Sequence, residues 1–202
     1  MTRRKRVTIS QVAQVAGVSK MTVSRVLNNR PDVSRETRRR IQQVIEELGY
    51  QPSQAARSLS QGHSRSIGVV AFGIEYFGPA RAVSGIEKQA AELGYTLLLY
   101  LMRDPENHDV DGTLADLLSR HVDGIIWAIP EIGNNRSWLD DHIPRLPVPL
   151  VFLSMQPRPD LSTACVNNYQ GAQLATQHLL DSGYETVGVI TGPINWWDAT
   201  ER

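Results

Sequence analysis

The most constraining stretch of the sequence runs from Thr8 to Asn29 and reads TISQVAQVAGVSKMTVSRVLNN. Thr8 is a suitable N-cap, and Gln11 three residues later completes a capping box, so we expect a helix to begin here. Gly17 permits a tight turn that a residue with a Cβ would resist. Ser19 is suited to cap a second helix. The stretch therefore predicts two short helices joined by a tight turn.

Each of the two predicted helices has one apolar face. The apolar positions are Val12, Val15 and Ala16 in the first helix, and Val23, Val26 and Leu27 in the second. The opposite face of the second helix carries Lys20, Met21, Ser24 and Arg25. A second helix with one apolar face and an opposite polar face, after a glycine turn, is typical of helix-turn-helix units that bind the major groove of DNA. An ordinary helical hairpin is the alternative interpretation of this stretch alone.

The net charge of the chain is zero, but the charges are unevenly distributed along it. Residues 1–65 contain 13 Lys and Arg against 4 Asp and Glu, a net charge of +9. Residues 66–202 contain 8 against 17, a net charge of −9. The basic part predicts a polyanionic partner whose phosphates it neutralises, whereas the acidic part is not expected to bind one.

The segment from Val12 to Asn28 fits the pattern VAxxAGVSxxTVSRVLN, and in this it resembles the DNA-binding headpiece of the LacI/GalR family of bacterial transcriptional regulators. The resemblance continues through residues 33–38 and 48–52 and covers essentially the whole chain. It implies a sequence-specific DNA-binding transcriptional regulator, expected to be a repressor. Such a regulator binds a near-palindromic operator in double-stranded DNA as a homodimer and is controlled by a small-molecule effector, which we expect to be a sugar.

The resemblance also implies a domain organisation. We expect an all-α helix-turn-helix headpiece at residues 1–50, a hinge helix or linker at 51–65, and an α/β periplasmic-binding-protein-like effector domain with a parallel sheet at 66–202. In the headpiece, a third helix is expected at 34–48, capped by Ser34 and ended by Gly49. Its apolar stripe is Ile41, Val44, Ile45 and Leu48.

The resemblance assigns the headpiece side chains to two kinds of DNA contact. Lys20, Met21 and Arg25 are expected at base edges, and Arg25 suits guanine because its fork can pair with O6 and N7 together. Short polar side chains are expected to contact phosphates, which position the protein without reading sequence. These are Thr8, Ser19, Thr22, Ser24, Asn28, Ser34 and Thr37.

The segments on either side of the headpiece are each open to two interpretations. The arm Arg3–Arg6 is a solvated tail or a nonspecific phosphate contact, and both can hold. In the hinge, the resemblance implies that Leu59 inserts between base pairs from the minor groove and kinks the duplex. The small side chain of Ala56 is expected to allow the hinge helix a close approach. The alternative for Leu59 is an isolated apolar residue in a linker.

From Ser66 onward, apolar runs alternate with amphipathic stretches, which predicts an open parallel α/β sheet. The predicted strands are 66–72, 96–101, 122–129, 150–153 and 186–191, and the predicted helices are 78–95, 109–120 and 169–182. Val83, Ile86, Ala90 and Leu93 are expected on one face of the first of these helices. We expect a first subdomain at about 66–166 and an incomplete second one, since one helix and one strand cannot bury a sheet. A truncated chain is the resulting expectation.

Ligands of open α/β folds bind at the carboxyl ends of the strands. The candidate effector residues are those that follow predicted strands, together with residues near the end of the sequence whose family counterparts bind effector. They are Tyr76, Arg103, Glu131, Ser154, Trp197, Asp198 and Arg202. Aromatic faces combined with carboxylate and guanidinium groups suit a sugar. The alternative is that Trp196 and Trp197 only pack and that Glu131 is a solvated loop acid.

Other classes of protein have little support in the sequence. No GxGxxG follows the first strand and no GxxxxGK[ST] occurs, so we expect neither a dinucleotide cofactor nor a nucleotide in a P-loop. Residues 62–66 lack the second glycine of a nucleophile elbow, and there is no HxxxH pair or second cysteine beside Cys165 for a metal site. We therefore expect no enzyme, no cofactor and no metal.

Two further expectations concern location and truncation. MTRRKRVTIS leads into no apolar run, which predicts no signal peptide, and no stretch of the sequence approaches the length of a membrane span. We therefore expect a cytoplasmic, nucleoid-associated location. Two alternatives to the effector-controlled regulator stay open. One is a truncated regulator that binds DNA but does not respond to effector, and the other is a sugar-binding protein without a regulatory role.

Overall fold

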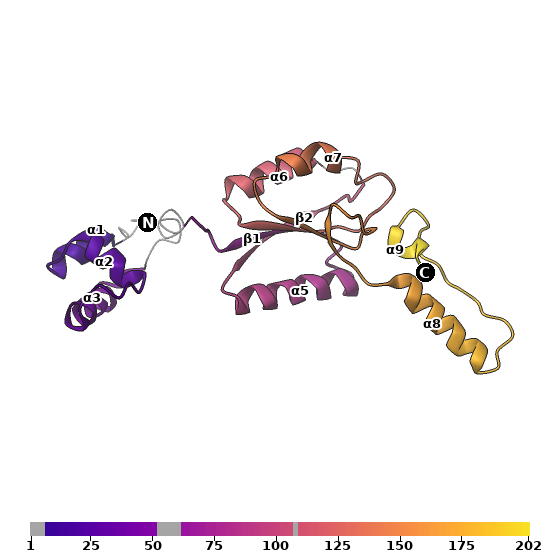
Figure 1. Cartoon of the computed structure of the whole chain (residues 1–202), viewed down its shortest axis with the longest axis horizontal. Helices are drawn as coiled ribbons and strands as arrows, with labels where there is room; N and C mark the ends of the chain where they lie inside the picture. The colour runs from indigo at the N-terminus through magenta and orange to yellow at the C-terminus, as the bar shows by residue number, and fades with distance from the viewer. Residues whose placement is uncertain (1–6, 52–61, 107–108) are drawn as a thin grey trace, which may run out of the picture. The chain divides into compact units, whose positions relative to one another are not determined.

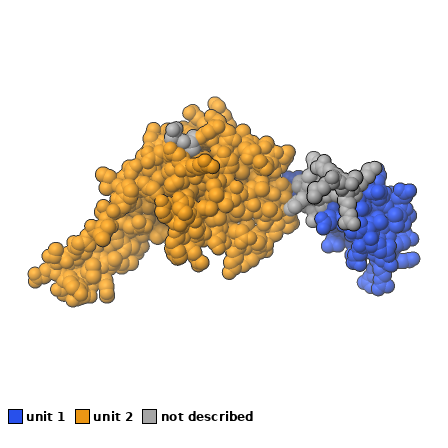
Figure 2. All heavy atoms as spheres, turned by 180° about the vertical axis from the view of Figure 1, so that it is seen from behind, with its two compact units in different colours: residues 1–63 blue, residues 64–202 orange. Residues whose placement is uncertain are grey.

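The computed structural model describes residues 7–51, 62–106 and 109–202. The chain divides into two compact units, residues 1–63 and 64–202, which are coloured separately in Figure 2. The arm Arg3–Arg6, Ala56 and Leu59 lie outside the described residues, so the roles expected of them stay predictions.

Unit 1 contains the three predicted helices, α1 (Ile9–Val15), α2 (Lys20–Leu27) and α3 (Arg35–Leu48). The Thr8 capping box is present, with both the side-chain and the backbone bond to Gln11. Ser19 and Ser34 accept the backbone N–H groups of Thr22 and Thr37 at 3.1 Å and 3.2 Å, so each caps the helix that follows it. Gly17 and Gly49 have φ angles of 63° and 61°, which favour glycine at these turns.

The core of unit 1 forms where the three helices face one another. Val12, Val23 and Ile41 are fully buried, one from each helix, and Val26, Val44 and Ala16 pack around them. One predicted core residue is not in this cluster. Val15 is 57% exposed, because it is the last residue of α1 and lies on the side that faces solvent.

Unit 2 is built on one five-stranded, fully parallel sheet of order β2-β1-β3-β4-β5. The strands are β1 (Ser66–Phe72), β2 (Thr96–Met102), β3 (Gly124–Ala128), β4 (Leu150–Leu153) and β5 (Ser162–Ala164). The parallel α/β sheet expected from the sequence is therefore present, and its first four strands lie where they were predicted. β5 was not predicted, because three residues with one apolar side chain carry no strand pattern.

Helices cover both faces of the sheet (Figure 1). Helix α5 (Phe77–Glu92) lies on one face, and α6 (Val110–Ser119) and α7 (Leu139–His142) lie on the other. A Cβ on Gly68 of β1 would come within 3.0 Å of the Leu117 side chain, so glycine at this position allows α6 to approach the strand closely. A short 3-10 helix, η1 (Ile143–Arg145), follows α7.

The core of unit 2 lies between the sheet and the α6–α7 layer. Trp127 and Phe152 on neighbouring strands are buried, and Trp138 packs against both, with ring centroids at 4.7 Å and 6.0 Å. Tilted aromatic contacts of this kind bury large apolar areas. On α5, Ala90 is buried as predicted, but Leu93 is exposed at the C-terminal end of the helix.

The final part of unit 2 differs most from the sequence-based expectation. Helix α8 (Asn168–Asp181) is present and projects from the rest of the unit (Figure 1), and a short helix α9 (Trp197–Thr200) follows later. The prediction of a strand at 186–191 is wrong, because this segment has no regular secondary structure and Ile190 is fully exposed. A strand needs a neighbour to accept and donate its backbone hydrogen bonds, and no described strand pairs with this segment.

No helix among the residues that the structure describes is long and apolar enough to cross a membrane.

His142 joins α7 to α6 through a pair that depends on pH. Its Nε2 lies 2.6 Å from Oδ1 of Asp111, and its Nδ1 lies 2.8 Å from the carbonyl of Trp138. The hydrogen bond with Asp111, followed by the one with the Trp138 carbonyl, raises the pKa of His142 above its usual 6.5. A raised folded-state pKa stabilises unit 2 fully below about pH 6.5, and this contribution is lost as pH rises through the folded value.

We expect Asp111→Asn to lower the stability of unit 2 at pH 6 by about 0.2–1 kcal/mol, the range for exposed pairs, and to change it less at pH 8.5. Thermal unfolding at both pH values measures this difference. Asp116→Asn, which removes a carboxylate of the same helix that pairs with Arg120, is the matched control and should change stability equally at the two pH values, because arginine stays charged at both. An Asp111→Asn effect independent of pH would contradict the pair's role.

Candidate nucleic-acid interface and effector site

The base-reading residues expected on α2 all lie on its exposed side. Met21 is 64% exposed, and Lys20 and Arg25 are exposed as well, while Val23 and Val26 on the opposite side are buried in the core. A large exposed apolar side chain flanked by two cations is suited to contact a base edge between phosphates. The helix therefore presents its polar face outward without disturbing the core of unit 1.

The residues expected to contact phosphates are concentrated at helix N-termini. Thr8, Ser19 and Ser34 are the N-caps of α1, α2 and α3. Thr22 and Thr37 share hydroxyl hydrogen bonds of 2.9 Å with Ser19 and Ser34, respectively. The side chains of Ser24 and Asn28 lie within 3.4 Å of each other along the same helix. The N-caps, Thr22 and Thr37 are thus held beside the positive ends of the helix dipoles, which favour anions. Asn28 is instead the C-cap of α2.

Arg38 is a residue whose importance the sequence did not reveal. From α3 its Nη1 donates to the carbonyl of Val26 and to Oδ1 of Asn29, both at 3.3 Å, and its Nη2 donates to the carbonyl of Arg30. These bonds satisfy carbonyls at the C-terminal end of α2, where a cation is also favoured by the helix dipole. This role could not be read from the sequence, because partners eight to twelve residues away give no local signal.

Arg25 on α2 forms an ion pair with an acidic residue in the loop that follows the helix. Nη1 of Arg25 lies 3.3 Å from Oδ2 of Asp32, and both side chains are 51% exposed. The helix-turn-helix pattern predicted a role for Arg25 but none for Asp32, which lies beyond the second helix.

In unit 2 the candidate effector residues divide into a connected group and two separate residues. Glu131 and Ser154 follow β3 and β4, which are adjacent in the sheet, and the Glu131 N–H donates to the Ser154 carbonyl at 2.9 Å. The N–H of Trp197 donates to the Glu131 carbonyl at 3.0 Å, so the start of α9 is attached to the same loop. Tyr76 and Arg103 follow β1 and β2 and are exposed. β1 pairs with β3, whereas β2 is the edge strand beyond β1.

The Glu131 carboxylate is itself engaged by neighbouring residues. One oxygen accepts the Gln156 N–H at 2.8 Å and the other lies 3.4 Å from Nη2 of Arg158. The nearby Arg136 is buried, donates to the carbonyl of Ile129, and lies over the Phe152 ring at 5.7 Å. Burial lowers the pKa of the Arg136 guanidinium to about 10, which still leaves it charged at neutral pH. These contacts stabilise the loop that carries Glu131.

Asp198 and Arg202 are brought together by a third residue, Asn168 at the start of α8. Its Nδ2 donates to Asp198 Oδ1 at 2.7 Å, and its Oδ1 accepts from Arg202 Nε at 3.0 Å. The Asn168 amide therefore fixes a carboxylate and a guanidinium as neighbours. Sequence reasoning missed Asn168, because its partners lie 30 and 34 residues further along the chain.

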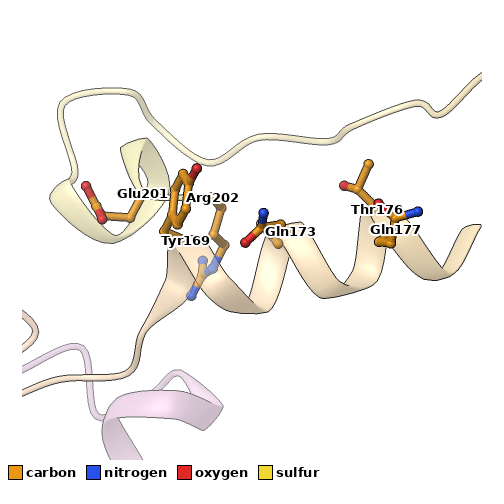
Figure 3. Close-up of a pocket in the computed structure, with 7 residues that line it drawn as sticks. Tyr169, Gln173, Thr176, Gln177, Glu201 and Arg202 are labelled. Atoms are coloured by element: carbon orange, nitrogen blue, oxygen red, sulfur yellow. The ribbon is translucent and has the colours of Figure 1, made fainter. Parts of the chain in front are cut away.

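A shallow pocket lies beside this group (Figure 3). It has a volume of about 280 Å³ and is lined by Tyr169, Ala172, Gln173, Thr176, Gln177, Glu201 and Arg202. Figure 3 shows Tyr169 and Arg202 near one another at the start of α8, with Gln173 further along the helix. An aromatic ring, a guanidinium and amides around an open pocket suit a polar ligand with some apolar surface.

A three-helix unit of the helix-turn-helix type is followed in the chain by a parallel α/β domain. The comparisons with known proteins recognise the same two parts of the chain. The family described as bacterial regulatory proteins, lacI family, matches residues 8–53. The family described as periplasmic binding proteins and sugar binding domain of LacI family matches residues 78–202. The chain belongs to the LacI family.

Individual relatives are similar over almost the whole chain. The HTH-type transcriptional repressor PurR of Klebsiella pneumoniae (strain 342) is 34% identical over 191 residues, which are 93% of this chain and 54% of the relative. Catabolite control protein A of Priestia megaterium is 33% identical over 195 residues, which are 94% and 57% of the two chains. The chain thus spans a little over half the length of these relatives, which are named as regulators and not as enzymes.

The fold is also similar to solved structures. The crystal structure of the lac repressor dimer bound to operator and the anti-inducer ONPF has a TM-score of 0.84 and 28% identity, covering 98% of this chain and 59% of that one. A transcriptional regulator CelR–cellobiose complex has a TM-score of 0.54 and 27% identity, covering 97% and 58%.

Proposed function

We propose that this chain binds DNA sequence-specifically and regulates transcription, most simply as a repressor. The observation that carries the proposal is the exposed face of α2, where Lys20, Met21 and Arg25 project from a helix whose other side is buried in the core. Polar side chains at the N-termini of α2 and α3 supply phosphate contacts on the same unit. The net charge of +9 on residues 1–65 supports binding to a polyanion.

We further propose that the chain acts as a homodimer on a near-palindromic operator. A two-fold dimer places one α2 in each of two major grooves about one helical turn apart. Exposed apolar side chains on α5 and on the edge strand β2 support a protein contact there; they are Phe77, Leu93, Leu99 and Leu101. The solved lac repressor with a similar fold is a dimer bound to operator. Ala56 and Leu59 would enter the central minor groove between the two half-sites.

The proposed effector site lies at the carboxyl edge of the sheet and at the start of α8. The group of Asp198, Asn168 and Arg202 offers both hydrogen-bond donors and hydrogen-bond acceptors to a ligand. Trp197 at the start of α9 precedes Asp198 in the chain, and its N–H donates to the carbonyl of Glu131 on the neighbouring loop. Tyr76, Arg103 and Ser154 complete the set of proposed contacts at the strand ends. A sugar effector is supported by the match to the sugar binding domain of the family and by the relative complexed with cellobiose.

Effector binding would change operator affinity because the effector has different affinities for two states of the domain. The match to the sugar binding domain over residues 78–202 supports this function over the alternative of an effector-insensitive fragment. It also supports a regulator over a sugar-binding protein without a regulatory role, since the headpiece family matches residues 8–53. The proposed location is the bacterial cytoplasm, at the nucleoid.

Selection of bound sites from a random duplex library by the 202-residue chain, at one near-physiological salt concentration, tests DNA recognition. The proposal predicts recovery of a near-palindrome with a central pyrimidine–purine step, which kinks easily. Recovery of no consensus sequence would contradict sequence-specific binding, and recovery of a single half-site would contradict binding as a dimer.

A thermal-shift screen with a panel of mono- and disaccharides tests the effector site. A sugar present at one hundred times its dissociation constant is expected to stabilise unit 2 by about 2.7 kcal/mol. Arg202→Ala should abolish this shift, because it removes the guanidinium that lines the pocket and bonds to Asn168. Arg145→Ala, which removes an exposed arginine of η1 that does not line the pocket, is the control and should leave the shift unchanged. A shift retained in Arg202→Ala would contradict the proposed site.

A further inference from the structure

The ion pair between Arg25 and Asp32 joins the proposed base-reading helix to the loop that follows it. Nη1 of Arg25 lies 3.3 Å from Oδ2 of Asp32, with both side chains half exposed. Asp32 is one of only 4 acidic residues among residues 1–65. A carboxylate beside a DNA-contacting side chain is repelled by phosphates and lowers the affinity for DNA. The ion pair with Arg25 is therefore the contact that can offset this loss of affinity.

The loop that carries Asp32 is fixed by hydrogen bonds to two helices. The N–H groups of Asn29 and Arg30 donate to the carbonyls of Val26 and Arg25 at 3.1 Å and 2.9 Å. Arg38 on α3 donates to Asn29 Oδ1 and to the Arg30 carbonyl. Pro31 then limits the backbone immediately before Asp32, because its ring fixes φ.

Because its backbone is held in this way, Asp32 offers a carboxylate at a defined position relative to α2. A guanidinium is planar and carries five N–H donors in a fixed arrangement. A carboxylate that engages Nη1 therefore limits the directions in which the remaining donors can point. An arginine without such a partner is free to turn toward phosphate oxygens, which give affinity without sequence information.

We propose that Asp32 is a positioning residue for DNA recognition: it orients Arg25 toward a guanine and thereby sets the base preference at one position of each half-site. The inference rests on the proposed function of α2. Asp32 also weakens binding to the wrong sequence, since its charge repels phosphates wherever Arg25 does not find its guanine. Its effect is thus on discrimination between sequences and only weakly on the stability of unit 1.

Selection from a random duplex library with the full chain, followed by sequencing of the bound fraction, tests this role. Arg25→Ala first identifies the base pair whose guanine preference depends on Arg25. At that base pair, Asp32→Ala and Asp32→Asn are expected to lower the guanine preference by about three- to tenfold, within the range of coupling between contacting residues. Preferences at the other positions should not change, and Asp32→Glu should restore part of the guanine preference.

The matched control is Glu46→Gln, which removes one negative charge from an exposed position on α3. It should strengthen binding to all duplexes slightly and leave every base preference unchanged. An unchanged guanine preference in Asp32→Ala, or an equal loss of preference at all positions, would contradict the role of Asp32 alone. Failure of the unaltered chain to select any consensus would instead contradict the proposed function, and the inference with it.

Discussion

Arg25→Ala is expected to remove the guanine preference at one base pair of each half-site, at a cost of about 1–3 kcal/mol for each bidentate pairing with guanine. Arg25 projects from the exposed face of α2, and its guanidinium is joined on one side to Asp32. Alanine at this position keeps the helix, because the buried side is formed by Val23 and Val26. Affinity for the selected duplex should therefore fall by about five- to 150-fold per half-site, while affinity for scrambled DNA falls much less.

Competition binding with the selected and a scrambled duplex at one salt concentration measures the two decreases in affinity separately. Arg39→Ala is the matched control, since it removes the same charge from an exposed position on α3. It should lower the affinity for both duplexes equally and leave the preference for the selected duplex unchanged. If Arg25→Ala also weakened both equally, Arg25 would be a phosphate contact and not a base-reading residue.

The second large effect is expected in the core of unit 1. Ile41 on α3 is fully buried against Val12 and Val23. Truncating a buried isoleucine to alanine costs about 2–5 kcal/mol. A unit of this size rarely gains more than about 3–5 kcal/mol from its core. Ile41→Ala should therefore unfold most of unit 1 at 37 °C and abolish DNA binding, while unit 2 keeps its own cooperative transition.

Scanning calorimetry of the full chain distinguishes the two transitions, and DNA binding is measured on the same samples. Val15→Ala provides the control, because this side chain in the same unit is 57% exposed and its truncation leaves no cavity. It should change the free energy of unfolding of unit 1 by less than about 0.5 kcal/mol. Loss of both transitions in Ile41→Ala would show that the units do not unfold independently.

The helix boundaries of unit 1 could be predicted because their determinants are local. Thr8, Ser19 and Ser34 accept hydrogen bonds from backbone N–H groups three residues away. Gly49 ends α3 by its own left-handed backbone conformation, which needs no distant residue. The apolar spacing of α3 likewise placed Ile41 and Val44 in the core. Val15 was assigned to the core wrongly, because an apolar residue at the end of a seven-residue helix fits the pattern whichever way it points.

Features that depend on distant residues could not be predicted in the same way. The apolar run at 186–191 has a strand-like composition, but no strand among the described residues pairs with it. Asn168 was missed for a related reason, since its role comes from Asp198 and Arg202 far along the chain. Arg38 and Asp32 likewise gain their importance from the fold of the loop after α2.

The most direct test of the central claim is the ratio of two affinities of the full chain, for a selected near-palindromic duplex and for the same duplex scrambled. Both are measured at one near-physiological salt concentration, because the phosphate contribution depends on salt. Sequence-specific recognition by α2 predicts a ratio of about a thousand or more. A ratio near one would mean that the basic unit binds DNA only as a polyanion, and it would contradict the assignment of this chain as a sequence-specific regulator.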